Sequence, residues 1–262
     1  MLLEYFKFIN TFICMIEFSG RESKLFNLRF GRATINSDFD QWNDVQKAVK
    51  EFNLDYLRLK IVNPDSDFLS GFRTMAPEAD LTGIIRLYKI IITHEHAQHP
   101  APIAVFKKAT QADKQLLKEL LIGTYTDVPF GFYQYPLLTK NFSLTLQMEN
   151  IGSYISDQFS DTEAGKEAYI GYLNGKPIEC FASDFRDSPT ASTLYAGILP
   201  EYRDNDLFKD MIRFFKNLCL QKGMTKAICG ARLENLPSQV AMEKEGSICY
   251  GHEWVYMIRF NK

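Results

Sequence analysis

The chain has 262 residues, of which 46% are hydrophobic and 24% are charged, a composition typical of a globular protein with a substantial core. Its 30 Lys and Arg side chains nearly balance 32 Asp and Glu side chains, so the formal net charge is only −2. Without an overall positive field, nucleic acid is not expected as a partner. At about 150 residues per domain, the length predicts two domains.

Three further features predict a soluble, cytoplasmic protein with no membrane partner. Glu4, Lys7 and Glu17 interrupt the apolar N-terminal segment, and no small-residue cleavage pattern follows it. Nowhere does the sequence reach the roughly 18 consecutive apolar residues that a spanning helix needs. The five cysteines have no close paired spacing, which is typical of reduced thiols and not of disulfides or a zinc site.

Residues 1–93 are predicted to form a small α+β domain. Strict alternation and apolar runs indicate strands at 25–34, 56–62 and 81–91. Between the first two, apolar residues from Trp42 to Phe52 recur at helical spacing. The polar, proline-containing segment 94–102 is expected to be a linker to a second domain at 103–262.

The second domain begins a new pattern, whose strongest local signal is Asn174-Gly175 between two apolar segments. Asn-Gly supplies the two positive φ angles of a tight hairpin turn. The other expected elements are a strand at 103–107, a capped helix from Thr110, a helix at 144–159, hairpin strands at 168–173 and 177–183, a strand at 193–199, a helix at 205–222, a strand at 225–229, a helix from Asn235 to Glu245 and a strand at 248–260. The predicted fold class is α+β, with a mixed, mostly antiparallel sheet flanked by helices.

This order of elements resembles the GNAT superfamily of acetyl-CoA-dependent N-acetyltransferases. With a small domain ahead, the layout is similar to the dTDP-fucosamine acetyltransferase-like branch, whose members acetylate an amino group on a nucleotide-linked sugar. Residues 26–35 stand in the place of that branch's opening strand, and residues 250–256 resemble its last strand. The resemblance implies a GNAT-like domain at 103–262, acetyl-CoA as co-substrate and a primary amine as acceptor, with an amino sugar nucleotide as the leading class.

The resemblance also implies where the cofactor's pyrophosphate binds. In the family a turn of Gln or Arg, two residues, Gly, one residue, and Gly or Ala follows a strand, because small residues let backbone N–H groups reach the phosphates. Arg203 matches the first position, whereas Asp206 and Phe208 stand in the two small-residue positions. We expect this turn at the start of a helix and at the open end of a V between two splayed strands. The residues expected to bind the cofactor are Ile198, Leu199, Arg203, Asp204, Asn205, Asp206, Leu207, Phe208, Asn235 and Met242.

The chemistry expected is direct attack of a neutral amine on the thioester, whose carbonyl is polarised by backbone N–H groups near Ile198 and Leu199. The family's next segment has an Asn followed seven residues later by a Tyr that protonates the leaving thiolate. Asn235 fits, but Met242 stands in the Tyr position and cannot donate a proton. Either another acid serves or the thiolate leaves unassisted. The candidate catalytic residues are His252, Tyr250 and Tyr195.

Other interpretations stay open at this point. His94, His96 and His99 suggest a metal site, but no Cys or carboxylate partner has diagnostic spacing, so no metal is expected. The aromatic segment 130–135 falls where the family builds its acceptor pocket, with packing between helix and sheet as the alternative.

Asp206 and Met242 favour a degenerate domain that has lost CoA and serves as a binding or assembly module. An enzyme acting on a peptide or a polyamine is a third possibility, and a homo-oligomer is compatible with each.

Overall fold

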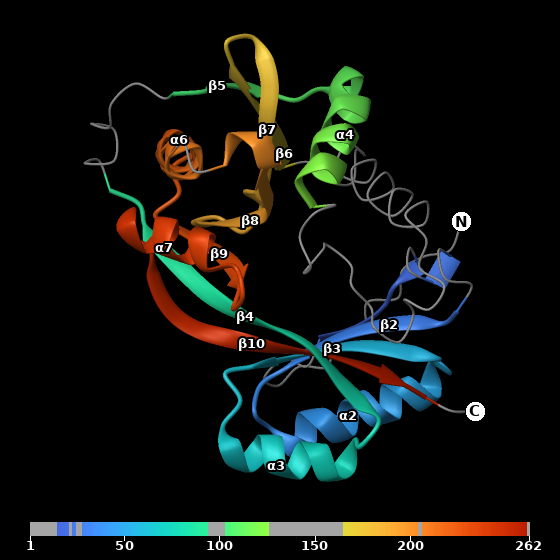
Figure 1. Ribbon diagram of the computed structural model, residues 1–262. Coiled ribbons are helices and arrows are strands. Elements are labelled where there is room, and N and C mark those ends of the chain that lie inside the picture. Colours follow the sequence, from blue (N-terminus) through green and yellow to red (C-terminus); the bar gives the residue numbers. More distant parts are fainter. Residues whose placement is uncertain are drawn as a thin grey trace. The chain divides into compact units, whose positions relative to one another are not determined.

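The computed structural model describes residues 15–20, 23–24, 28–93, 103–125, 165–203 and 206–260 (Figure 1). The chain divides into two compact units. The first unit runs to Ile85 and resumes at Gly251, and the described residues between Arg86 and Tyr250 belong to the second. The predicted linker at 94–102 and the helix expected at 144–159 lie outside the described residues.

The first unit is an α+β layer built on a βαβ crossover. Its elements are β1 (Met15–Phe18), β2 (Phe30–Ile35), α2 (Phe39–Glu51), β3 (Tyr56–Val62), α3 (Ser66–Met75), the beginning of β4 (Ala79–Ile91) and most of β10 (Ile248–Arg259). β2 and β3 are parallel, and α2 connects them. β10 pairs with β3 in the antiparallel sense from Glu253 to Arg259, which is why the C-terminal strand joins this unit and not the second domain predicted for it.

The second unit is a sheet with helices on both faces. Its elements are the end of β4, β5 (Val105–Lys108), η2 (Gln111–Asp113), α4 (Lys114–Tyr125), β6 (Lys166–Leu173), β7 (Lys176–Asp184), β8 (Thr190–Ile198), η5 (Pro200–Tyr202), α6 (Leu207–Gln221), β9 (Lys226–Arg232), α7 (Leu236–Lys244) and the first residues of β10. The strand order is β4-β9-β8-β7-β6-β5. Phe181 on β7 packs toward α6, whereas its neighbours Cys180 and Ala182 pack toward α4. The predicted α+β class with a mixed sheet is confirmed.

Local sequence signals account for several of these elements. The hairpin between β6 and β7 turns at Asn174 and Gly175, whose φ angles are 53° and 80°, as predicted. Before α4, the N–H of Thr110 donates to Asp113 Oδ2 at 2.7 Å, which completes the predicted capping box. The helix α3 was not predicted, although Asp65 caps it by accepting the N–H of Phe68 at 2.7 Å. No helix in the described part of the chain has both the length and the apolar character that a membrane span requires.

The strands β8 and β9 are parallel and separate toward their C-terminal ends. Their pairing covers Thr190–Ser192 on β8 and Lys226–Ile228 on β9. Beyond it, the register of β8 against β7 shifts between Thr193 and Tyr195, so that β8 carries a bulge. A bulge bends its strand, and β8 turns away from β9. The two strands form the V that the sequence predicted.

The same succession of elements occurs once in each half of the chain. β2-α2-β3-α3-β4 and β8-α6-β9-α7-β10 each consist of two parallel strands joined by a helix, a second helix and a long strand. They differ where the first strand leads into its helix. β2 ends at Ile35 and α2 begins at Phe39, whereas β8 ends at Ile198 and α6 begins only at Leu207. Arg203 and Asp206 of the longer connection line a pocket.

Candidate functional site

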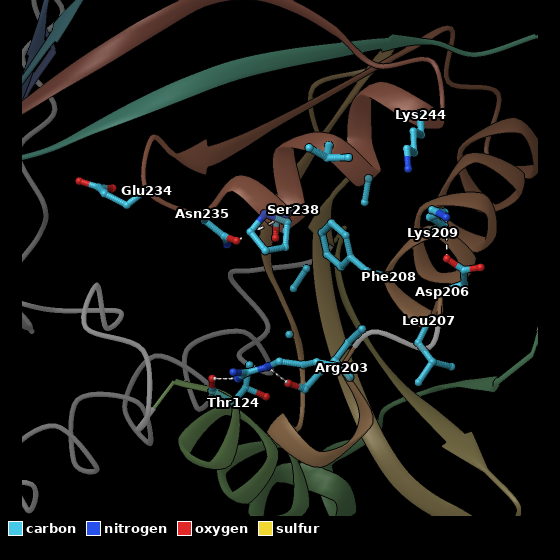
Figure 2. Close-up of a pocket in the computed structure, with 16 residues that line it drawn as sticks. Thr124, Arg203, Asp206, Leu207, Phe208, Lys209, Glu234, Asn235, Ser238 and Lys244 are labelled. Atoms are coloured by element: carbon cyan, nitrogen blue, oxygen red, sulfur yellow. Dashed lines mark hydrogen bonds and ion pairs between the residues drawn. The ribbon is translucent and has the colours of Figure 1, made fainter.

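A pocket of about 650 Å³ opens in the second unit, where β8 and β9 have separated. Its lining comes from the last residues of β8, the first turn of α6 and one side of α7 (Figure 2). Arg203, Asp206 and Phe208 of the predicted cofactor turn all take part in it, as does Asn235 at the start of α7. The structure therefore brings most of the residues predicted from the resemblance into one cavity.

Arg203 holds two walls of the pocket together. Its Nη2 donates to the backbone carbonyl of Thr124 at 2.8 Å, and its Nε donates to the carbonyl of Ile198 at 3.2 Å. Thr124 belongs to the last turn of α4 and Ile198 is the last residue of β8. The guanidinium thus joins α4 to β8 and fixes the end of the V.

Asp206, which stands in the first small-residue position of the family's turn, has an unusual backbone conformation. Its φ of 57° lies in the left-handed region, which glycine enters freely and Asp tolerates better than most residues. Its carboxylate lies 2.5 Å from Lys209 Nζ, and 66% of its side chain is exposed. The hydrogen bond and charge of Lys209 lower the pKa of Asp206, with smaller effects from Arg213 and Lys244. The carboxylate is therefore charged, and Lys209 neutralises it.

The first turn of α6 differs in its cap from the first turns of α2, α3 and α7. Asp38 accepts an N–H of α2, Asp65 accepts one of α3 and Asn235 accepts one of α7. The side chain of Asp206, the residue before α6, makes no such bond. The first N–H groups of a helix have no partner within the helix and carry its positive dipole end. At α6 the carboxylate of Asp206 does not cap these groups.

Cationic side chains outnumber carboxylates around the cavity. Arg203, Lys209 and Lys244 line it together with Asp206 and Glu234. Lys209 and Lys244 lie on the same side, close to Asp206 (Figure 2). Together with the start of α6, they make this end of the pocket suited to a phosphate group. Among the described residues, no group of His, Cys, Asp and Glu side chains could hold a metal ion.

The helices that carry this cationic end are tied together in the core. Arg213 of α6 forms two hydrogen bonds to the carboxylate of Glu245, at 2.6 and 3.0 Å. Lys216 Nζ donates to the carbonyl of Glu245, and burial lowers the pKa of this lysine. Glu245 directly follows α7. The position of Lys244 relative to α6 is fixed by these bonds.

The backbone N–H groups of Ile198 and Leu199, both predicted to polarise the thioester carbonyl, point in different directions. The N–H of Leu199 donates to the carbonyl of Ile178 at 2.9 Å, so this donor already has a partner and the prediction for Leu199 does not fit. Along an antiparallel ladder, hydrogen-bonded and non-hydrogen-bonded pairs alternate. The pair next to Leu199 and Ile178 is Ile198 with Glu179, which is therefore non-hydrogen-bonded. The N–H of Ile198 thus points away from β7. That direction is toward the gap where β9 has separated. Ile198 therefore keeps the predicted geometry.

The pocket includes neither the candidate catalytic residues nor Met242. Tyr195 is 4% exposed and packs in the cluster beneath α4. Met242 is also 4% exposed, with its Sδ 3.3 Å from Cys229 Sγ in the core, so it does not reach the cavity. Tyr250 and His252 are not among the residues that line it. The predicted Asp204 and Asn205, the aromatic segment 130–135 and the three linker histidines lie outside the described residues.

Sequence reasoning missed ten of the sixteen residues that line the pocket, among them three with polar side chains that matter here: Thr124, Lys209 and Lys244. The lysines had a signal, because Lys209 belongs to the first turn of α6, and Lys244 repeats at helical spacing after Pro237 and Ala241, which also line the cavity. Thr124 had none, since only tertiary packing brings α4 to β8.

The comparisons with known proteins concern the fold. No protein-family model and no curated protein matches the sequence. A functionally unknown conserved protein from Staphylococcus epidermidis ATCC 12228 is similar with a TM-score of 0.66 and 14% identity, over 97% of this chain and 94% of that one. A GCN5-related N-acetyltransferase from Sphaerobacter thermophilus is similar with a TM-score of 0.61 and 7% identity, over 93% of this chain and 76% of that one. A GCN5-related N-acetyltransferase from Kribbella flavida is similar with a TM-score of 0.54 and 12% identity, over 89% of this chain and 82% of that one. The protein has the fold of GNAT acetyltransferases.

Proposed function

We propose that the protein is an acyl-CoA-dependent N-acyltransferase, in the simplest case an N-acetyltransferase. The observation that carries this proposal is the start of α6, where backbone N–H groups that Asp206 does not cap meet Lys209 and Lys244 in a pocket. Such an arrangement suits a pyrophosphate. Asp206 keeps the left-handed backbone of the turn, so its side chain does not prevent the turn from forming.

The remainder of the pocket fits the rest of CoA. The ladder pairs between β8 and β9 end at Ser192 and Ile228, so beyond them a pantetheine arm can lie along β8 as a neighbouring strand would. Phe208 extends from the start of α6 toward α7 (Figure 2). The arm would pass beside this ring to bring the thioester to Ile198.

In the proposed reaction the nitrogen of a neutral amine attacks the carbonyl carbon of the thioester. A C–N bond forms, the C–S bond breaks, and the proton lost by the amine is balanced by the one that CoA thiolate takes up. The N–H of Ile198 stabilises the charge that develops on the carbonyl oxygen. Because Met242 stands in place of the family's Tyr and a thioether has no proton to donate, the thiolate leaves without that donor, which the ordinary thiol pKa of about 8.5 permits.

The acceptor is proposed to be a small primary amine, with an amino sugar nucleotide as the leading class. Its support is the resemblance of residues 26–35 and 250–256 to the dTDP-fucosamine acetyltransferase-like branch. Incubation with acetyl-CoA and separate sugar nucleotide, peptide and polyamine acceptors, followed by release of free CoA thiol, tests this choice. Thiol release with an amino sugar nucleotide is expected, and release with polyamines alone would contradict it.

The second candidate is a module that kept the fold without catalysis, which the burial of Met242 favours. Thermal unfolding with and without acetyl-CoA separates the two. A ligand at about 100 times its dissociation constant stabilises a protein by about 2.7 kcal/mol. The enzyme is expected to show a clear rise in Tm, and the absence of any rise at millimolar acetyl-CoA would support the module.

A further inference from the structure

Thr124 has a buried hydroxyl that no step described so far uses. The residue is 4% exposed, and its Oγ1 has no hydrogen-bond partner among the described residues. Leaving a buried hydroxyl unpaired costs about 1–3 kcal/mol, and folded proteins keep few such groups. Thr124 also lines the pocket. A ligand bound in the pocket can supply the missing partner.

The position of Thr124 is fixed from two directions. Its own carbonyl accepts the hydrogen bond of Arg203 at 2.8 Å. Its side chain lies against Gly197 of β8, where an added Cβ would be 2.1 Å from Thr124 Cγ2 and 3.1 Å from Oγ1. A glycine at 197 is therefore required for this approach. It places the hydroxyl beside the residue that precedes Ile198.

We propose that the Thr124 hydroxyl donates a hydrogen bond to the carbonyl oxygen of the acyl thioester, as a second donor beside the N–H of Ile198. The inference rests on the proposed function. A carbonyl oxygen has two lone pairs, and two fixed donors on it bind more strongly as negative charge develops. Thr124 thereby positions the acyl group and distinguishes acyl-CoA from free CoA, which has no carbonyl at that place.

Calorimetric titrations of the full chain with acetyl-CoA and with CoA test this role. Thr124→Val keeps the shape of the side chain and removes the hydroxyl, whereas Thr124→Ser keeps the hydroxyl. We expect Thr124→Val to weaken acetyl-CoA binding about three- to tenfold and to leave CoA binding within twofold. Thr124→Ser is expected to bind both ligands as the unmodified protein does. Thr124→Ala provides a second hydroxyl-free variant that relieves the contact with Gly197.

The outcomes separate this inference from the proposed function. If the unmodified protein binds CoA but the hydroxyl-free variants bind acetyl-CoA unchanged, only the role of Thr124 is overturned. Equal weakening of CoA and acetyl-CoA, or a loss of acetyl-CoA affinity in Thr124→Ser, would assign Thr124 a structural role and overturn the inference as well. If the unmodified protein binds neither ligand, the proposed function and the inference both fail.

Discussion

Lys209 and Asp206 form an ion pair of 2.5 Å at the mouth of the pocket, between the residue before α6 and the third residue of that helix. The pair gives the carboxylate a partner in place of the helix N–H groups, which it does not cap. It also engages one of the lysines that a phosphate would use. Asp206 is therefore both tolerated by the turn and a competitor of the ligand for Lys209.

Removing the charge of Asp206 is expected to strengthen CoA binding. Asp206→Gly ends the competition for Lys209, removes a like charge from the pyrophosphate and suits the left-handed backbone, so we expect the affinity to rise about tenfold. Asp206→Asn, which also tolerates that backbone, separates the effect of charge from that of conformation. The gain should shrink at high salt. An unchanged or lower affinity in both variants, measured by calorimetry, would mean that the carboxylate does not oppose the ligand.

The contribution of Lys209 should depend on Asp206. Lys209→Met is expected to weaken CoA binding about threefold in the unmodified protein and about tenfold when combined with Asp206→Asn, because the lysine no longer shares its charge there. Lys226→Met is the matched control, since Lys226 is exposed and pairs with Thr190 at the closed end of the V. An effect of Lys209→Met that is smaller in the Asp206→Asn background would contradict the competition.

Glu179 should make the protein less stable at alkaline pH. It is fully buried on β7, neither carboxylate oxygen has a hydrogen-bond partner among the described residues, and burial together with the charge of Asp210 raises its pKa to about 8. Between the ordinary 4.5 and 8, the unfolded chain has lost a proton that the folded chain keeps, so stability falls as pH rises through that window. Glu179→Gln is expected to stabilise at pH 8, on the order of 3 kcal/mol, and little at pH 4.5. If the variant and the unmodified protein differed in unfolding midpoint by the same amount at both pH values, the prediction would be contradicted.

Glu167 should have the opposite pH dependence. Burial favours a higher pKa, but hydrogen bonds from Lys108, Tyr169 and Lys222 outweigh it and lower the pKa to about 2. Its stabilisation is present above the ordinary 4.5 and is lost as pH falls toward 2. Glu167→Gln is therefore expected to destabilise at pH 7, on the order of 2 kcal/mol, and much less at pH 3. Denaturant titrations at the two values measure the difference, and a constant difference would refute the assignment.

Patterns of neighbouring residues in the sequence predicted several strands and turns correctly. Alternation gave the bounds of β3 at 56–62, and Asn174-Gly175 gave the hairpin. The helix α3 was missed despite its capping Asp65 and the helical spacing of Phe68 and Phe72, because the segment has only ten residues. The pairing of β10 with β3, which places most of β10 in the first unit, had no local signal in the sequence. The two strands are far apart in the chain, and their pairing depends on the whole sheet.

The sequence predicted the position of the turn that forms the site, but not which side chains contact one another there. The spacing after Arg203 located the start of α6. Which face of α7 meets the pocket depends on how the helix is rotated, and Ala241, not Met242, is on that face. The partners of Asp206 and Thr124 depend on packing that no spacing in the sequence shows.

A calorimetric titration of the full chain with CoA tests the central claim most directly. We predict saturable binding at one site per chain, weakened by salt because phosphates provide much of the attraction. One site is expected because the short connection before α2 leaves no turn there, and Asp38 already caps that helix. No measurable binding at millimolar CoA, in the unmodified protein and in Asp206→Gly alike, would contradict the claim that the start of α6 is a CoA site.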